Sequence, residues 1–222
     1  METQILDNND FGNKKEESMR NNIDRANYTI YAYSFIFILS IIVLIINVYS
    51  ISSPSNADSV LFIKDIILGF NLLVFVVAFI LFLMWFRRAY KNIQIIGYET
   101  KHTDGWAVGG FFLPFKGLYY PYNIMTEIWQ KMKLTAEGNG IKHYLKGGIH
   151  GWWWFFWLMS FIGYYFSFKM EMRGELENFT TVIPTFGDVF LNIIDVLDAL
   201  FTVLVVKSLR DTEKELREHG GF

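Results

Sequence analysis

The chain has 222 residues, of which 52% are hydrophobic and 18% aromatic, and its formal net charge is -2. This composition is too apolar for an ordinary water-soluble surface and indicates a protein embedded in a membrane. Because the chain has no cysteine, disulfides, thiolate zinc sites, cysteine nucleophiles and palmitoyl or prenyl anchors are excluded. The charge balance argues against a general nucleic-acid binder, which carries a clustered basic excess, so we expect no nucleic-acid partner.

Four long apolar segments predict an all-α membrane protein folded as a four-helix transmembrane bundle. As a helix, about 20 apolar residues cross the roughly 30 Å hydrocarbon layer of a bilayer. The third segment carries a run of tryptophans, which suit the level of the lipid headgroups. The predicted spans cover residues 30–51, 66–86, 149–168 and 184–206.

Lysine and arginine are distributed unevenly around these spans. Four basic residues precede the first span in a polar tail (residues 1–26), nine lie in the connector of residues 87–146, and four follow residue 206. With four crossings, 17 of the 20 basic residues fall on one side. Because cytoplasmic segments carry the basic excess, we predict a multi-pass protein of the cell membrane with both termini cytoplasmic. The transmembrane domain would cover residues 27–210, and residues 211–222 would form a charged cytoplasmic tail.

The connector turns apolar again between residues 105 and 129, but glycines and prolines interrupt it too often for a straight spanning helix. We therefore predict a re-entrant or interfacial helical segment over residues 105–133. It would consist of a turn at residues 105–120 and a short amphipathic helix from Pro121 to about Lys133. Non-helical backbone at membrane depth has to be covered by protein, so a re-entrant turn would pack against the spans. The alternative is a helix pair lying flat on the cytoplasmic face.

Polar side chains form a stripe along the predicted fourth span. At about 100° per residue, the stripe occupies an arc of about 120° on the helix. An unpaired carboxylate near mid-membrane, where Asp195 is expected, costs about 2.5 to 3.5 kcal/mol on insertion scales. The stripe is therefore either a site for an ion, a proton or a polar solute, or a buried network that fixes helix packing. Its members are Asp188, Asn192, Asp195, Asp198 and Thr202.

Depth along the helices suggests partners for this stripe, because the second and fourth spans run in the same direction. Three contacts follow: Lys64 near Asp188, Asn71 near the level of Asn192, and Arg87 or Arg88 reaching back toward Asp198. Asn71 therefore joins the stripe as a candidate for binding an ion or a ligand.

Four motifs follow one another along the second span and the connector. They are Trp85-Phe86-Arg87-Arg88-Ala89-Tyr90-Lys91-Asn92, Gly105-Trp106-Ala107-Val108-Gly109, Phe112-Leu113-Pro114-Phe115, and Pro121-Tyr122 with Met125, Glu127 and Trp129. In this order they resemble the signature of the bacterial membrane proteins called the domain of unknown function 4328 family. The resemblance covers roughly residues 66–206 and implies a multi-span membrane domain without naming a chemistry. The structural or motif candidates are Arg88, Asn92, Trp106, Pro114, Pro121, Glu127 and Trp129.

Several of these residues have both a structural and a functional interpretation. Arg88 would either tie the connector to the bundle or bind a ligand. Glu127 would either accept hydrogen bonds from the backbone of the re-entrant turn or lie solvated on the surface. Trp106, Trp129 and the tryptophan run of the third span would either anchor the protein at the membrane interface or form an aromatic box for a quinone, a haem edge or a lipid.

The four histidines lack metal-ligand spacing, and the patterns of phosphate loops, dinucleotide sites and serine hydrolases are missing from the sequence. We therefore predict no metal and no cofactor. Two function classes remain: a non-catalytic membrane scaffold or sensor, and an oligomeric ion, proton or small-solute channel or transporter that uses the stripe. A membrane enzyme acting on lipid is a weaker alternative, with Glu127, His102 and Arg88 as a loose set of groups. The expected partners are the lipid bilayer and either a second copy of the chain or another membrane protein.

Overall fold

The computed structural model describes residues 19–52, 57–113, 115–172 and 183–219. Within these ranges all regular secondary structure is helical. The short helix α3 (Trp106–Gly109) and the 3-10 turns η3 (Gly110–Phe112) and η4 (Lys116–Leu118) lie in the connector. The long helices are α1 (Ile23–Ser52), α2 (Ala57–Ile95), α4 (Tyr120–Gly138), α5 (Ile149–Met172) and α6 (Ile183–His219).

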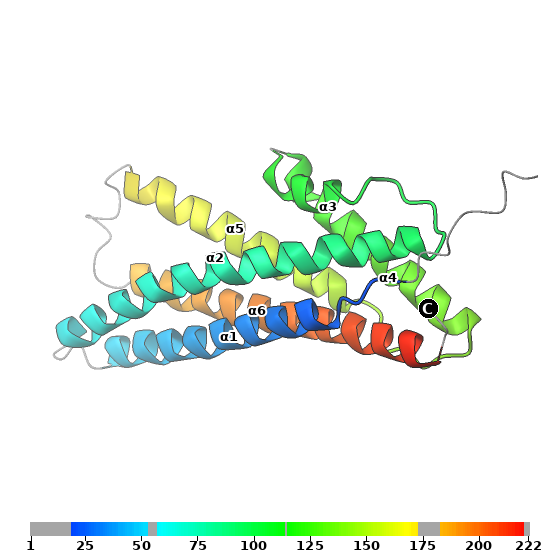
Figure 1. Cartoon of the computed structure of the whole chain (residues 1–222). Coiled ribbons are helices and arrows are strands. Elements are labelled where there is room, and N and C mark those ends of the chain that lie inside the picture. The colour runs from blue at the N-terminus through cyan, green and yellow to red at the C-terminus, as the bar shows by residue number, and fades with distance from the viewer. Residues whose placement is uncertain (1–18, 53–56, 114, 173–182, 220–222) are drawn as a thin grey trace, which may run out of the picture.

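Three of the long helices form an elongated bundle. Helix α1 packs against both α2 and α6, and α5 packs against α6. Figure 1 shows α1, α2 and α6 running side by side, with α5 crossing them obliquely. The start of α1, the end of α6 and the connector gather at one end of the bundle, which we call the connector end (Figure 1). There α4 packs against α2, α5 and α6.

Three helical segments of the described chain are long and apolar enough to cross a membrane: Ile23–Ser52, Ile66–Ile95 and Gly187–His219. They confirm the predicted all-helical fold with the character of a membrane protein, and they match the predicted first, second and fourth spans. Helices α2 and α6 continue past the ends of those predicted spans. The predicted charged tail is therefore, up to residue 219, a continuation of α6.

The predicted third span corresponds to α5, a helix of 24 residues that is not among the three apolar segments. Its tryptophans and tyrosines carry a polar N–H or O–H on a large apolar ring, which lowers their hydropathy. At Gly163, an added Cβ would collide with the Leu191 side chain of α6. A glycine at this point therefore allows the two helices to approach closely.

Aromatic side chains form the core near the connector end. Phe82, which is only 2% exposed, has its ring centroid 5.5 Å from that of Trp85 and 5.8 Å from that of Trp153. Tyr33 of α1 meets the same ring edge to face. One aromatic cluster thus joins α1, α2 and α5.

The connector folds back along α2 as far as this cluster. The Phe111 ring lies 5.7 Å from Phe79, 6.1 Å from Phe82 and 5.9 Å from Trp157, measured between centroids. Phe79 lies seven residues before the end of the predicted second span, so the contact is about 10 Å back along the helix. Phe111 thereby fills space between α2 and α5.

The turn that carries Phe111 is tight and also exposes apolar side chains. A Cβ on Gly117 would lie 3.0 Å from the Phe111 carbonyl oxygen, so this close approach requires glycine. Phe112 and Phe115 are 67% and 86% exposed. Pro114, one of the predicted motif residues, lies outside the described residues.

The amphipathic helix predicted over residues 121–133 is observed as the longer helix α4. Its buried face includes Ile124, Ile128 and Met132, which recur at helical spacing. Pro121 is buried in the first turn, where the missing N–H costs no helical hydrogen bond. Helix α4 therefore belongs to the packed core at the connector end.

Candidate functional site

The polar stripe of α6 contacts two different helices. The side-chain amide of Asn47 in α1 donates a hydrogen bond to Asn192 Oδ1. Asp195 instead accepts hydrogen bonds from Ser160 Oγ, at 3.1 Å, and from the Tyr164 hydroxyl, both on α5. The stripe therefore cross-links α6 to α1 and to α5.

Asp198 lies one turn further along α6 and is differently placed. Its Oδ1 atom is buried and has no hydrogen-bond partner among the described residues. Thr202 donates its hydroxyl to the backbone carbonyl of Asp198, a bond within the helix. The Asp188 side chain, near the start of α6, is exposed. Asp198 thus retains an acceptor that no described group uses.

The amide pairing expected across α2 and α6 does not form. Asn192 has Asn47 as its partner, and Asn71 has a buried Oδ1 without a hydrogen-bond partner in the described part of the chain. The physical reason is that α1 packs between α2 and α6. The proposed neighbour of Asp188 was Lys64, whose side chain lies outside the described residues.

The two arginines at the end of the predicted second span have partners at the connector end, in place of the predicted contact with Asp198. Arg87 forms an ion pair with Asp104, with Nε 2.9 Å from Oδ2. Arg88 is half-buried and lies within electrostatic reach of Glu213 on α6. Arg87 therefore fastens the loop that contains Asp104 to α2, whereas Arg88 lies near the like charges of Arg25 and Arg20 as well as near Glu213.

A hydrogen-bond network joins the end of α2 to α4. The buried Tyr90 donates its hydroxyl to Glu127 Oε2 at 2.7 Å and accepts the backbone N–H of His102 at 3.2 Å. Glu127 Oε1 accepts the backbone N–H of Lys101 at 3.3 Å and lies 3.8 Å from Lys131 Nζ. Glu127 is therefore no ordinary solvated glutamate. It accepts a backbone hydrogen bond as predicted, but from the loop that precedes the turn.

The residues just before α1 tie α2 to α6. Asn92, which is fully buried, bonds the backbone of Arg20 in both directions, at 2.8 and 3.1 Å. Asn22 donates its side-chain amide to the Trp85 carbonyl and its backbone N–H to Glu213 Oε1. The motif residue Asn92 therefore has a structural role in the described chain.

Glu213 is a buried carboxyl group in the part of α6 beyond the predicted span. It is 3% exposed and lies seven residues, or about 10 Å of helix, past Val206. Burial raises its pKa to about 7, while the hydrogen bond from Asn22 and the charges of Arg217 and Arg88 oppose the rise. This group therefore titrates near neutral pH.

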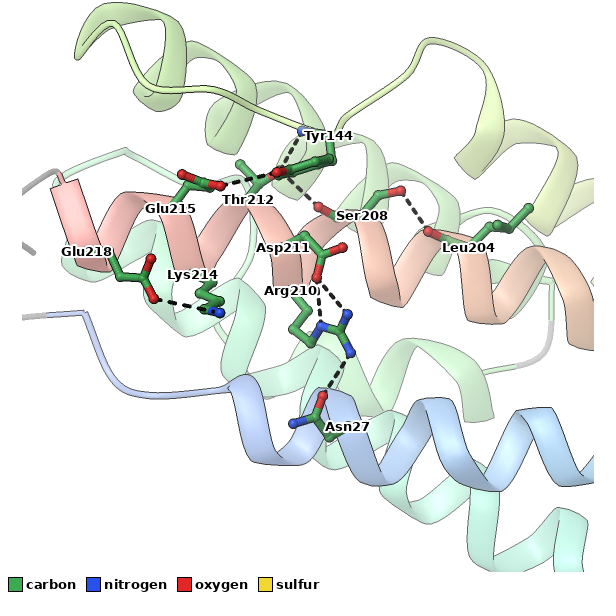
Figure 2. Close-up of polar contacts among 10 residues, drawn as sticks. All are labelled: Asn27, Tyr144, Leu204, Ser208, Arg210, Asp211, Thr212, Lys214, Glu215 and Glu218. Carbon is green, nitrogen blue, oxygen red and sulfur yellow. Dashed lines mark hydrogen bonds and ion pairs between the residues drawn. The ribbon is translucent and has the colours of Figure 1, made fainter.

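Further contacts fasten the last turns of α6 to their surroundings (Figure 2). The Tyr144 backbone N–H donates to Thr212 Oγ1 at 3.0 Å, and the Tyr144 hydroxyl donates to Glu215 at 3.1 Å. Arg210 donates to Asn27 of α1 at 2.9 Å. The segment between α4 and α5 is thus attached to α6, so the connector end is one packed unit. We call it the cap: α3, α4 and their loops, packed on the ends of α2 and α6.

The predicted tryptophan candidates lie in two separate clusters. Trp106, which is exposed, lies beside Tyr120 and His102. Trp129 is buried, with its ring 5.1 Å from that of His150. The structure does not bring the two tryptophans into one aromatic box.

Sequence reasoning missed Asn47, Ser160 and Tyr164, the partners of the stripe. A signal was present for Asn47, because it is the only amide residue in the predicted first span. A polar amide within a span faces another helix rather than lipid. The two hydroxyl residues carry no comparable signal, since serine and tyrosine are ordinary in spans.

The comparisons with known proteins extend this account. A family model described as Domain of unknown function (DUF4328) matches residues 53–211. No curated protein and no solved structure matches the chain. The matched region contains α2, the connector, α5 and most of α6.

Proposed function

We propose, from the premise that this chain belongs to the family described as Domain of unknown function (DUF4328), that it is a non-catalytic membrane scaffold or sensor module. Four helices would span the cell membrane. The cap and both termini would lie on the cytoplasmic side.

In this proposal α5 is the third of four spans and adds to the three apolar segments named above. Its 24 residues correspond to about 36 Å, enough for the roughly 30 Å hydrocarbon layer. It contacts α6 through polar and aromatic groups, and it exposes large apolar side chains elsewhere. Such a surface is suited to lipid rather than water. The exposed side chains are Phe155, Phe161, Ile162, Tyr165, Phe166 and Phe168.

The positions of basic residues support the orientation. Most of the lysines and arginines lie in the cap and at the helix ends beside it, the side to which four crossings assign 17 of the 20. A basic excess of this kind is typical of the cytoplasmic side. Phe112 and Phe115, exposed beside the bundle, suit an interfacial segment that dips into the cytoplasmic leaflet.

One observation carries the scaffold proposal: polar side chains of the proposed spanning helices form hydrogen bonds that join one helix to another. Asn47 pairs with Asn192, and Asp195 pairs with Ser160 and Tyr164. The described residues of the four motifs lie instead between the last turns of α2 and α4, at the connector end. The bundle therefore serves to hold the cap at the membrane, where it is available to a partner.

A second candidate function is an oligomeric channel or transporter for a proton or cation. It is favoured by one observation, the buried Oδ1 of Asp198, which has no hydrogen-bond partner among the described residues. The few spans would require several copies to enclose a path.

Flux measurements separate the two functions. We expect proteoliposomes of the purified chain to show the same proton and potassium flux as empty liposomes. Flux above that level that disappears in Asp198→Asn, with folding unchanged, would overturn the scaffold proposal. The matched control is Ser208→Ala, which removes a hydroxyl of α6 that lies outside the stripe and donates to the Leu204 carbonyl of the same helix.

A further inference from the structure

The cap contains an open cavity of about 480 Å³ between the last turns of α2 and the loop that follows it. Its wall is made of hydrogen-bonding and cationic side chains together with one tryptophan. The residues that line it include Lys91, Gln94, Thr100, Lys101, Thr103 and Trp106.

The wall of the cavity is held in place before any ligand binds. Gln94 donates its amide to Thr100 Oγ1 at 2.9 Å and to the His102 carbonyl at 3.1 Å. The His102 backbone N–H is in turn bonded to the buried Tyr90 hydroxyl. A loop anchored in this way loses little conformational entropy on binding, which favours affinity.

The charge of the cavity is positive. Asp104, the carboxylate on the wall, is neutralised by its ion pair with Arg87. Lys91 and Lys101 also line the cavity, and neither ammonium group is paired with a carboxylate within the described part of the chain. A cleft with charges of one sign concentrates ligands of the opposite sign.

We propose that this cavity binds a phosphate group. The ammonium groups of Lys91 and Lys101 supply charge-assisted donors, and the Thr103 hydroxyl and the Trp106 N–H supply neutral ones. The phosphate belongs either to the headgroup of an anionic phospholipid or to a soluble phosphate compound. Only the lipid source depends on the membrane orientation proposed above.

The position of the cavity suits a lipid headgroup. Trp106 is 39% exposed, and the turn that follows it exposes Phe112 and Phe115. An exposed tryptophan in the wall of a basic cavity, followed along the chain by exposed phenylalanines, matches the boundary between acyl chains and headgroups.

The test compares two double variants with the same loss of charge. Lys91→Ala/Lys101→Ala changes the cavity, and Lys133→Ala/Lys146→Ala changes the same end of the molecule outside it. In the first arm, protein in nanodiscs of phosphatidylcholine with phosphatidylglycerol is released into native mass spectrometry, and retained phosphatidylglycerol is counted. In the second arm, inorganic phosphate is titrated calorimetrically onto protein in pure phosphatidylcholine nanodiscs.

We expect the cavity variant to bind about thirtyfold more weakly, as the loss of two lysines near a membrane surface implies, while the control variant binds like the native chain. A loss confined to the first arm identifies the lipid headgroup, and a loss in the second arm identifies a soluble phosphate. If the two double variants behave alike in both arms, the proposal is overturned. That result would leave the scaffold proposal, which is tested by flux, unaffected.

Discussion

Replacing Asp195 tests whether the polar stripe serves packing. Asp195→Leu removes the acceptor of the hydrogen bonds from Ser160 and Tyr164, and so breaks the polar link between α5 and α6. Asp195→Asn keeps one oxygen to accept from Ser160 and gains an N–H that donates to the Tyr164 oxygen. The two variants therefore differ in hydrogen bonding and agree in removing the charge.

The magnitudes follow from the two lost bonds. An interhelical hydrogen bond in a membrane protein is worth about 0.6 kcal/mol on average and up to about 1.7 kcal/mol. The exposed Tyr164 hydroxyl would face lipid in the proposed orientation, and a donor left unsatisfied away from water costs about 1 to 3 kcal/mol. We expect Asp195→Leu to lower the free energy of unfolding by about 2 to 4 kcal/mol, and Asp195→Asn by less than about 1 kcal/mol.

Unfolding in mixed detergent micelles, followed by tryptophan fluorescence, measures these differences. A double-mutant cycle with Tyr164→Phe should give a coupling energy of about 0.5 to 1.5 kcal/mol between Asp195 and Tyr164. Asp188→Leu is the control, because the same change is made there to an exposed side chain. A zero coupling energy together with native stability of Asp195→Leu would refute the reasoning.

Three further predictions concern the cap. Because burial raises the folded pKa of Glu213 from 4.5 to about 7, the contribution of this group to stability is fully present below pH 4.5 and is lost as pH rises through 7. Thermal unfolding across this range should show Glu213→Gln abolishing that loss, a gain of up to about 3 kcal/mol at pH 8. Gly117→Ala should cost about 1 to 3 kcal/mol because its Cβ would press on the Phe111 carbonyl, whereas the control Gly138→Ala, with open space around it, should be neutral or stabilising in the same melts. Tyr90→Phe should speed hydrogen exchange of the loop at residues 98–103 about fivefold, from the loss of about 1 kcal/mol of hydrogen bonding, and unchanged exchange would contradict the network.

The helices themselves could be predicted from the sequence, because a long apolar segment in a membrane has to satisfy its own backbone hydrogen bonds and a helix does so. The spans at residues 30–51 and 66–86 lie inside α1 and α2, and the amphipathic pattern after Pro121 became α4. The extensions of α2 and α6 could not be predicted in the same way. Their charged surfaces resemble those of a solvated tail. Contacts with α4, with the start of α1 and with Tyr144 make them part of the fold.

The partners of the stripe depend on which helices are neighbours, and one-dimensional depth does not determine that. Asn71 and Asn192 were matched by depth, but α1 separates their helices and supplies Asn47 instead. The periodicity of the stripe did place polar groups on protein-facing sides of α6. Which stripe residues contact α1 and which contact α5 cannot be predicted without knowing which helices are neighbours.

The motif residues show a similar limit. Their order identifies the family, and their types suggest a structural role, but the bond between Tyr90 and Glu127 joins residues 37 positions apart. Such a contact depends on how the connector folds back onto α2. The cavity beside it, lined by Lys91 and Lys101, is likewise a property of the folded loop rather than of any motif.

The central claim, a four-span module with a cytoplasmic cap, is tested most directly by thiol labelling, because the chain has no cysteine of its own. Single substitutions at Ser52, Ser167 and Thr103 place one thiol at the far end of α1, near the end of α5, and in the cap, all at exposed positions. In intact cells a membrane-impermeant maleimide should label Ser52→Cys and Ser167→Cys, and should label Thr103→Cys only after permeabilisation. If Ser167→Cys instead behaves like Thr103→Cys, α5 does not cross the membrane and the claim is contradicted.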